Sequence, residues 1–353
     1  MRRTIVLYLL SILSVSALGQ NGGKGIYQFL DLPISARVTA LGGNLIAVKD
    51  NDLNVSLTNP SLLTDSMDNN IALSYINFFG GIKYGYAAYA KHFNKIGNFS
   101  AGIHYVDYGK FIRADEIGNT DGYFYSQDMS FNIAYERSIL DSNLTVGATL
   151  KTIYSHLDTY TSSGSVVDLG ATYLRPKSNF AIAYVIKNIG EQWKSYVPGN
   201  KEKMPFEMQL GISKKPKHVP LRLSVVYENL QKWDLTYVDP ATATVDPLTG
   251  VAISQNKYKA FGDKLMRHIV VGGEFIITKN IFLRLGYNYR VRKEMLIPEK
   301  RGADGFSFGF GFRVYKFHFS YGRSMYHLAG STNNISLSFD INSFCSKRFV
   351  STK

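Results

Sequence analysis

The sequence is almost free of cysteine. Its 353 residues include one, Cys345, so the chain cannot form an internal disulfide, and strand pairing must supply its stability. Long apolar runs are also scarce. Beyond the N-terminus, no stretch approaches the about 18 apolar residues that a membrane-spanning helix requires. The seven histidines show neither i,i+4 nor clustered spacing, so the sequence indicates no zinc site, and it gives no sign of another cofactor.

Acidic residues are outnumbered by basic ones. The chain has 27 Asp and Glu against 40 Lys and Arg, which gives a formal net charge of +13. A basic balance can suit nucleic acid, but no segment resembles a nucleic-acid-binding module. Many of the basic residues fall at alternating strand positions or in short turns, where a barrel lumen or rim would place them. We therefore expect lipid head groups, not nucleic acid, as the main anionic neighbours.

The one long apolar run lies at the N-terminus. Met1–Arg3 is positively charged, Ile5–Val15 is apolar, and Ala17 to Gly19 supplies small residues before a cleavage point. This order is typical of a secretory signal peptide. We predict a signal peptide over residues 1–19, cut before Gln20. No cysteine follows the cut, so a lipid anchor is not expected.

Aromatic residues are abundant, with 24 Tyr and 22 Phe. Near the C-terminus they alternate with small, polar and basic residues. Successive side chains of a strand point to opposite faces, so this alternation puts the aromatics on one face. Large apolar groups outside and small or polar groups inside are typical of a transmembrane β-barrel. The two clearest alternating sets are Phe306, Phe308, Phe310 and Phe312, then Tyr315, Phe317, Phe319 and Tyr321.

The same pattern recurs along most of the chain and predicts an all-β protein, a 14-stranded antiparallel transmembrane barrel over residues 69–344 with a tail at 345–353. The predicted strands are 70–79, 82–93, 97–108, 123–137, 143–155, 165–175, 179–188, 204–214, 219–232, 266–278, 281–292, 303–313, 314–326 and 333–342. Short connections alternate with longer ones. We expect the longer ones outside the cell, at 109–122, 156–164, 189–203, 233–265, 293–302 and 327–332.

Residues 20–68 alternate poorly and precede the first predicted strand. Their apolar content is too high for a disordered tail. We predict a plug, or hatch, folded into the lumen; a periplasmic tail is the alternative. Arg37 is a lone charge in an apolar run, and an enclosed charge needs a partner. The candidates are Asp50, Asp52 or the inward-facing Glu274, unless Arg37 lies exposed at the rim.

Four short motifs in this segment resemble a known family. They are Tyr27–Leu30, Ser35–Arg37, Ala40–Gly43 and Asn59–Leu63. Together they resemble the N-terminal signature of the PorQ family of type IX secretion outer-membrane proteins. The wider resemblance is to FadL-type 14-stranded barrels and to the PorV family, in which a similar run forms a hatch. The resemblance implies hatch roles for Tyr27, Phe29, Arg37, Leu41, Gly42, Gly43, Asn59 and Pro60.

The resemblance also implies a function. PorQ-like proteins belong to an attachment complex that transfers secreted cargo onto lipopolysaccharide. The barrel is expected to hold a PorZ-like surface protein, near PorU-like (sortase) and PorV-like (shuttle) proteins. It implies no catalytic residue and no enzyme activity. The alternative is a FadL-like transporter of hydrophobic small molecules across the outer membrane.

Aromatic residues in the two largest predicted external loops are candidate partner contacts, because Trp and Tyr are enriched at binding hot spots. An aromatic girdle at the membrane surface is the alternative, above all for the two tryptophans at strand ends. The candidate contacts are Trp193, Tyr196, Trp233, Tyr237 and Tyr258.

A formal G-x-S-x-G match at 305–309 lies within an alternating strand. A nucleophile elbow instead needs a sharp turn between a strand and a helix, so the match does not indicate a hydrolase.

Overall fold

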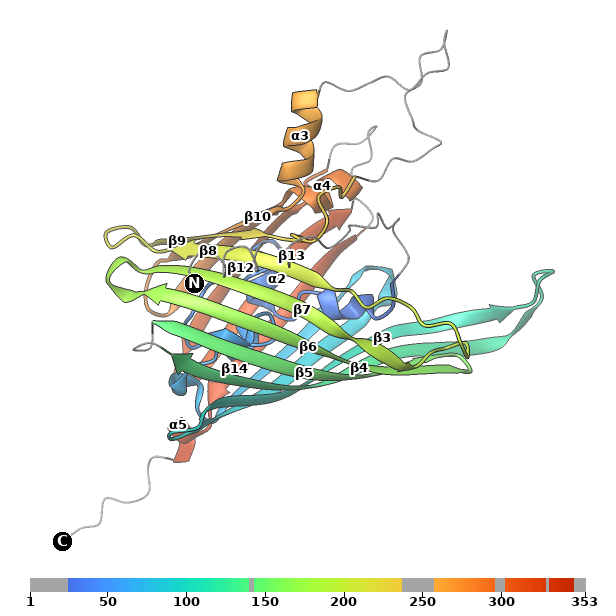
Figure 1. Ribbon diagram of the computed structural model, residues 1–353, viewed down its shortest axis with the longest axis horizontal. Coiled ribbons are helices and arrows are strands. Elements are labelled where there is room, and N and C mark those ends of the chain that lie inside the picture. The colour runs from blue at the N-terminus through green and yellow to red at the C-terminus, as the bar shows by residue number, and fades with distance from the viewer. Residues whose placement is uncertain (1–24, 140–142, 237–256, 296–301, 328–329, 346–353) are drawn as a thin grey trace, which may run out of the picture.

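The chain folds as a closed antiparallel β-barrel of 14 strands (Figure 1). The computed structural model describes residues 25–139, 143–236, 257–295, 302–327 and 330–345, so the predicted signal peptide lies outside the described residues. The strands are β1 (Asn70–Asn77), β2 (Lys83–Phe93), β3 (Gly97–Ala114), β4 (Thr120–Ile139), β5 (Leu144–Leu157), β6 (Tyr160–Arg175), β7 (Phe180–Lys194), β8 (Glu207–Lys214), β9 (Leu221–Tyr227), β10 (Ile269–Ile276), β11 (Ile281–Asn288), β12 (Phe306–Val314), β13 (Phe317–His327) and β14 (Gly330–Asp340).

Each strand pairs with its neighbours in the sequence, and β1 pairs with β14 to close the ring, with Ser74 opposite Ser336. Closure leaves no free sheet edge within the ring, which a structure in lipid requires. The predicted fold class, an antiparallel barrel of 14 strands, is confirmed. No helix among the described residues combines the length and the apolar character needed to cross a membrane.

The aromatic alternation has the predicted orientation. On β12, Phe308 and Phe310 are 38% and 42% exposed on the outer face, while Ser307 is buried in the lumen. Phe310 lies opposite Tyr321 of β13, and the two rings are 5.5 Å apart. Aromatic rings of neighbouring strands therefore meet side by side on the outer wall, where cross-strand contacts stabilise the sheet.

The strands are uneven in length. β3 and β4 have 18 and 20 residues, whereas β8 and β9 have 8 and 7. β2 pairs with β3 as far as Asp107, and β5 pairs with β4 only from Ser126 onward. Residues 108–125 therefore form a two-stranded ribbon that continues beyond the ring, and Figure 1 shows it extending away from the barrel. We call this segment the β3–β4 ribbon, and the end of the barrel that carries it the loop end.

The structure corrects several predicted connections. Most of 109–122 is strand, and 156–164 is reduced to a turn between β5 and β6, because strand pairing continues where the apolar alternation stops. The 189–203 segment begins as strand, since β7 runs to Lys194. The strand predicted over 281–292 ends at Asn288, whose side chain accepts a bond from Val291 N (3.1 Å) and starts helix α4 (Tyr289–Met295). The 233–265 segment contains most of helix α3 (Lys257–Met266), and its part at 237–256 lies outside the described residues.

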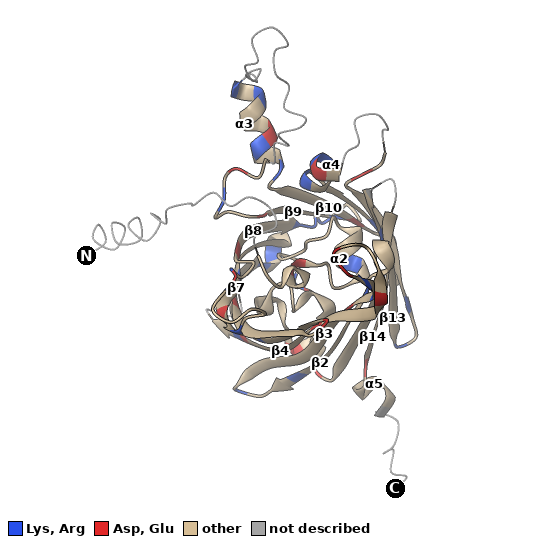
Figure 2. Ribbon diagram, turned by 90° about the vertical axis from the view of Figure 1, so that its right-hand side faces the viewer, with Lys and Arg blue, Asp and Glu red and all other residues tan. Residues whose placement is uncertain are grey.

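Residues 25–69, here called the luminal segment, lie inside the ring of strands (Figure 2). Their short elements are η1 (Gln28–Asp31), α2 (Ala36–Ala40), η2 (Leu53–Val55), η3 (Pro60–Leu62) and η4 (Asp65–Met67). Side-chain caps start several of them: Ser35 accepts from Val38 N, and Asn59 accepts from Ser61 N. The segment descends from the loop end, where Ile26 N donates to Lys203 O, to the opposite end, where Asn69 N donates to Ala90 O.

Glycines of the inner wall allow the luminal segment to pack directly on the strands. A Cβ atom added at Gly309 would collide with Ala40, and one at Gly322 with the backbone of Ala36. Further around the ring, a Cβ at Gly211 would collide with Ile46. The small residues that alternate with aromatics thus mark the places where the luminal segment contacts the wall.

The outward orientation of Phe310 yields a first prediction. Phe310→Arg would place a charge in the lipid and should destabilise the barrel by about 2–4 kcal/mol, whereas Val314→Arg, at the end of the same strand, should cost about 0–1 kcal/mol. Denaturant unfolding in lipid vesicles measures both values. Equal costs at the two positions would contradict the membrane-spanning orientation of β12.

Candidate functional site in the barrel lumen

A group of buried charges fixes α2 to the barrel wall. The guanidinium of Arg37 lies 2.7 Å from an Asp50 carboxylate oxygen, 3.2 Å from Asp52 and 2.9 Å from Glu274 of β10. The Arg37 side chain is 5% exposed, so these contacts replace water around the charge. All three carboxylates proposed from the sequence are therefore partners of Arg37, and its exposure at the rim is excluded.

Two wall arginines complete this group. Arg222 of β9 contacts Asp50 (2.8 Å) and Glu274 (3.0 Å), and Arg284 of β11 donates to Glu274 Oε1 (2.9 Å). Burial alone would raise the pKa of the Asp50 carboxyl, but Arg37 and Arg222 outweigh that effect and hold the pKa well below its usual range. Asp50 therefore stays ionised at neutral pH, and acid would weaken this contact only below the usual carboxyl range. We call these six residues the Arg37 cluster: Arg37, Asp50, Asp52, Arg222, Glu274 and Arg284.

Asn59 and Pro60 attach the segment to the opposite wall. The Asn59 side chain donates to Ile46 O (2.7 Å) and to Thr172 Oγ1 of β6 (3.1 Å), and it accepts from Ser61. Gly147 of β5 and Gly170 of β6 face each other in the sheet behind them. A Cβ at Gly147 would collide with Pro60, and one at Gly170 with Asn59. The Asn-Pro motif thus packs against a part of the wall that has no side chains on its inner face.

Leu41, Gly42 and Gly43 form the turn after α2. Leu41 is 2% exposed, in an apolar cluster inside the lumen. Gly42 and Gly43 have φ values of +99° and +95°, a region that favours glycine. Gly42 N donates to Thr39 O and Gly43 N to Val38 O. This double-glycine turn ends α2 and directs the chain along the wall.

At the loop end, the lumen has an aromatic lining. Tyr27 and Phe29 are buried, with their rings 6.5 Å apart, and Tyr27 Oη is bonded to Ser162 Oγ of β6 (2.5 Å). The Phe29 ring lies 5.4 Å from the ring of His104 on β3. Both predicted hatch aromatics therefore contact the inner wall near the mouth of the barrel.

Aromatic side chains of the barrel itself extend this lining. Phe78 stacks on Phe79 in the β1–β2 connection (4.1 Å), and its ring also contacts those of Tyr84 (5.9 Å) and Tyr326 of β13 (5.6 Å). Phe78 and Tyr326 remain partly exposed. We call the whole lining the aromatic mouth. Its aromatic members are Tyr27, Phe29, Phe78, Phe79, Tyr84, Tyr108, Tyr196 and Tyr326.

The four predicted partner contacts that the structure describes do not form one surface. Trp193 lies on β7 with its side chain 61% exposed, and Tyr258 is 89% exposed on α3. Trp233 packs against Phe261 of α3 and against His268. Tyr196 packs with the aromatic mouth and hydrogen-bonds Ser155, so it belongs to the lumen. Tyr237 lies outside the described residues.

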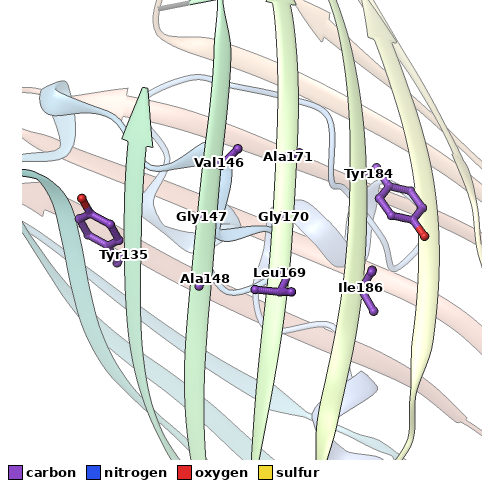
Figure 3. Close-up of a pocket in the computed structure, with 9 residues that line it drawn as sticks. All are labelled: Tyr135, Val146, Gly147, Ala148, Leu169, Gly170, Ala171, Tyr184 and Ile186. Carbon is purple, nitrogen blue, oxygen red and sulfur yellow. The ribbon is translucent and has the colours of Figure 1, made fainter. Parts of the chain in front are cut away.

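An apolar groove of about 390 Å³ lies on the outer face of the wall, over the Gly147–Gly170 pair. Figure 3 shows Tyr135 and Tyr184 on either side of it, with the luminal segment behind the strands. Ala148 and Ala171 are among the small residues that line it. The wall between this groove and Asn59–Pro60 therefore consists largely of backbone.

The described residues contain no group of three or more His, Cys, Asp or Glu side chains placed to hold a metal ion. The lumen instead combines an ion-paired region with an aromatic mouth.

Sequence reasoning missed the aromatic mouth because its members come from many strands. The adjacent pair Phe78–Phe79 beside Gly80–Gly81 was the available signal, since two aromatics at a hairpin tip fit neither face of an alternating strand.

No family model matches the chain, and no curated protein matches it. Solved structures show a similar fold. The toluene transporter TodX of P. putida has a TM-score of 0.51 at 13% identity, with 88% of this chain and 99% of that chain covered. A TodX variant described as a monoaromatic hydrocarbon channel gives 0.50, also at 13% identity and with the same coverage. A Pseudomonas aeruginosa FadL homologue gives 0.49 at 11% identity, covering 87% of this chain and 98% of that one.

The Arg37 cluster yields a second prediction. Arg37→Met removes a buried cation from three carboxylates, a change that typically costs 3–5 kcal/mol where no other partner remains. Arg222 and Arg284 still neutralise part of the charge, so we expect a cost of about 2 kcal/mol, confined to the luminal segment. Hydrogen exchange at residues 36–43 should accelerate at least about tenfold, and conductance to small ions in planar bilayers should rise.

The control is Lys201→Met, which removes a cation from an exposed pair with Glu191 (side chains 59% and 73% exposed). Such a surface pair contributes little, so exchange and conductance should not change. If Arg37→Met behaves like Lys201→Met, the cluster does not hold the luminal segment in place.

Proposed function

We propose that this protein is an outer-membrane barrel through which hydrophobic small molecules pass, with the aromatic mouth as their entry site. The aromatic mouth is the observation that carries this proposal. General porins have polar, water-filled lumens. Here Phe78 packs against Tyr84 and Tyr326 at the loop end of the lumen, in an apolar lining that also includes Tyr27 and Phe29 of the luminal segment. Transfer of apolar surface from water to such a lining is favourable by about 25 cal/mol per Å².

The luminal segment sets the second requirement of this function. It runs through the ring from the loop end to the opposite end with most of its side chains buried, so it lies in the path of a solute that crosses the lumen. A hydrophobic molecule bound at the mouth would have to displace part of the segment or move along it. The Arg37 cluster, at the far half of the lumen, would keep the remainder of the segment fixed during that step.

Two further points support the proposal. TodX, described as a toluene transporter, has a barrel of similar fold, and nearly its whole length aligns with this chain. The loop end carries the long connections and the β3–β4 ribbon, which in bacterial barrels is the external side. With the loop end on the outside of the cell, a hydrophobic solute would reach the aromatic mouth first.

Substitution in the mouth tests the proposal. Phe78→Asp removes the contact between the Phe78 ring and the solute, which is worth about 0.5–1.5 kcal/mol for an aromatic pair, and adds a charge beside the bound solute. Affinity for a fluorescent hydrophobic dye should fall at least about threefold, and dye uptake into proteoliposomes should fall with it. Ile117→Asp, at the 85% exposed tip of the β3–β4 ribbon, is the matched control and should change neither value. Unchanged uptake in Phe78→Asp, or equal uptake of a hydrophilic sugar, would refute the passage function.

A second candidate function is favoured by the β3–β4 ribbon: attachment of a PorZ-like surface protein, in a complex with PorU- and PorV-like proteins. β3 has 18 residues. At about 3.3 Å per residue and a tilt of about 40°, it rises roughly 45 Å, well above an apolar band of about 25 Å. The ribbon therefore stands clear of the membrane, and it adds nothing to the closure of the ring.

The ribbon presents apolar side chains where no lipid covers them. Ile112 is 62% exposed, Tyr123 57% and Tyr125 60%. Lys110 to Ala114 pair with β4 alone, so the other edge of this part of β3 is open. Exposed aromatic groups and a free strand edge are the features to which a partner protein can add a strand. Asp115, Glu116 and Asp121 make the tip acidic, which favours a partner with a basic surface over anionic lipopolysaccharide.

Shortening the ribbon tests attachment. Residues 109–124 are replaced by an Asn-Gly turn, which suits a two-residue hairpin. The ring should stay intact, because β2 and β5 pair with the parts of β3 and β4 that remain. Attachment predicts normal barrel levels, with the PorZ-like partner released into the medium.

A variant with 236–262 shortened to a Gly/Ser turn is compared in parallel, because the sequence had indicated this loop as the contact surface. Release of the partner by the loop variant alone would assign attachment to the loop instead of the ribbon. Retention of the partner by both variants would refute the attachment function.

A further inference from the structure

Beside the aromatic mouth, the lumen has a polar wall. Asn44 of the luminal segment, Gln209 of β8 and Glu228 just after β9 are 6%, 1% and 6% exposed. Asn44 Nδ2 donates to Glu228 Oε1 (2.7 Å). Gln209 precedes Leu210 and Glu228 follows Tyr227, and Leu210 and Tyr227 are paired across antiparallel strands, so Gln209 and Glu228 are neighbours on adjacent segments of the wall. Asn44 therefore contacts Glu228 directly, and Gln209, which donates to Glu207 Oε2 (2.7 Å), lies on the strand beside Glu228.

Each of these side chains leaves one acceptor oxygen without a hydrogen-bond donor among the described residues: Asn44 Oδ1, Gln209 Oε1 and Glu228 Oε2. Buried polar atoms are usually paired, and an unpaired acceptor costs about 1–3 kcal/mol. Arg290 Nη2 of α4 forms an ion pair with Glu228 Oε2 at 3.6 Å, a distance too long for a hydrogen bond. Three buried acceptors in one group indicate a ligand that supplies donors.

The polar wall adjoins the aromatic mouth. The one-turn element η1 carries Phe29 and Leu30 of the apolar lining together with Asp31. Asp31 accepts a bond from Asn188 Nδ2 (3.2 Å), beside Lys187 of β7. The Asp31 side chain is exposed, so solvent reaches η1 directly beside Phe29 and Leu30.

We propose that the preferred ligand of this lumen is an amphipathic amine, with its apolar body in the aromatic mouth and its ammonium head on Asn44, Gln209 and Glu228. A primary ammonium has three N–H donors and no acceptor, which matches the three unpaired oxygens. Glu228, which is ion-paired with Arg290 but not hydrogen-bonded to it, supplies the opposite charge. A ligand with a carboxylate head would place its acceptor oxygens against the three unpaired acceptors of the wall, and its negative charge beside that of Glu228. This inference rests on the proposed passage of hydrophobic molecules and names the class of molecule.

Three ligands of equal chain length test the head group. Octylamine, octanol and octanoate compete with a bound fluorescent hydrophobic dye on the full-length protein in lipid nanodiscs. We expect octylamine to bind at least about fivefold more tightly than octanol and tenfold more tightly than octanoate. Partition into protein-free nanodiscs is measured for each compound and subtracted.

Variants locate the preference. Glu228→Gln removes the charge and keeps an acceptor for Asn44, and Gln209→Met removes an unpaired oxygen without a change in charge. Each should reduce the ratio of octylamine to octanol affinity at least threefold. Glu191→Gln, an exposed carboxylate near the end of β7, should leave the ratio unchanged. Gel mobility with and without heating confirms that each variant folds.

The outcomes separate the two proposals. Amine preference in the native protein that is lost in Glu228→Gln and Gln209→Met supports the inference. Equal affinities for the three compounds, or tightest binding of octanoate, overturn it while leaving hydrophobic passage intact. Failure of all three compounds to displace the dye overturns the passage function as well.

Discussion

Closure of the hydrogen-bonded ring is the constraint on which the rest of this structure depends. Once β1 pairs with β14, every strand has two neighbours, and the wall separates an outer face from a lumen. The period-two alternation then assigns each residue to one of two environments. Phe310 goes to the outside and Gly309 to the inside, where its missing side chain lets Ala40 approach the backbone. The same ring also determines how much space the luminal segment has to fill.

Inside the ring, two kinds of interaction hold the luminal segment. Far from the loop end, Arg37 is surrounded by carboxylates and its position is set by charge and hydrogen-bond geometry. Near the loop end, Tyr27 and Phe29 are held largely by apolar packing, with one side-chain hydrogen bond from Tyr27. Apolar packing is non-directional and tolerates an exchange of one apolar partner for another. The loop-end half is therefore the part of the segment that a hydrophobic solute can replace at the least cost.

The sequence predicts those features in which a local pattern and the final environment agree. The aromatic alternation of β12 and the carboxylate partners of Arg37 belong to this class. The alternation of side chains along a strand and the pairing of a buried charge do not depend on the conformation of the loops. The sequence predicts residues 109–122 of the β3–β4 ribbon as a loop, since both faces of the ribbon meet water and the adjacent Phe111 and Ile112 are both exposed and follow no core-facing pattern. The sequence likewise indicated a strand to residue 292, but the Asn288 side chain caps α4 and ends β11.

A single bulge shows why site residues are harder to predict than strands. Lys187 and Asn188 lie opposite Asp168 alone, with Asn188 at φ +60° and its N–H bonded to the Asp168 carboxylate (2.8 Å). The extra residue reverses the inward and outward faces of β7 beyond it. Gln192 consequently points into the lumen and Trp193 points out, and the chain then returns Tyr196 to the aromatic mouth. A long-range hydrogen bond between β6 and β7 therefore decides which aromatics line the lumen, and no local pattern within β7 contains that information.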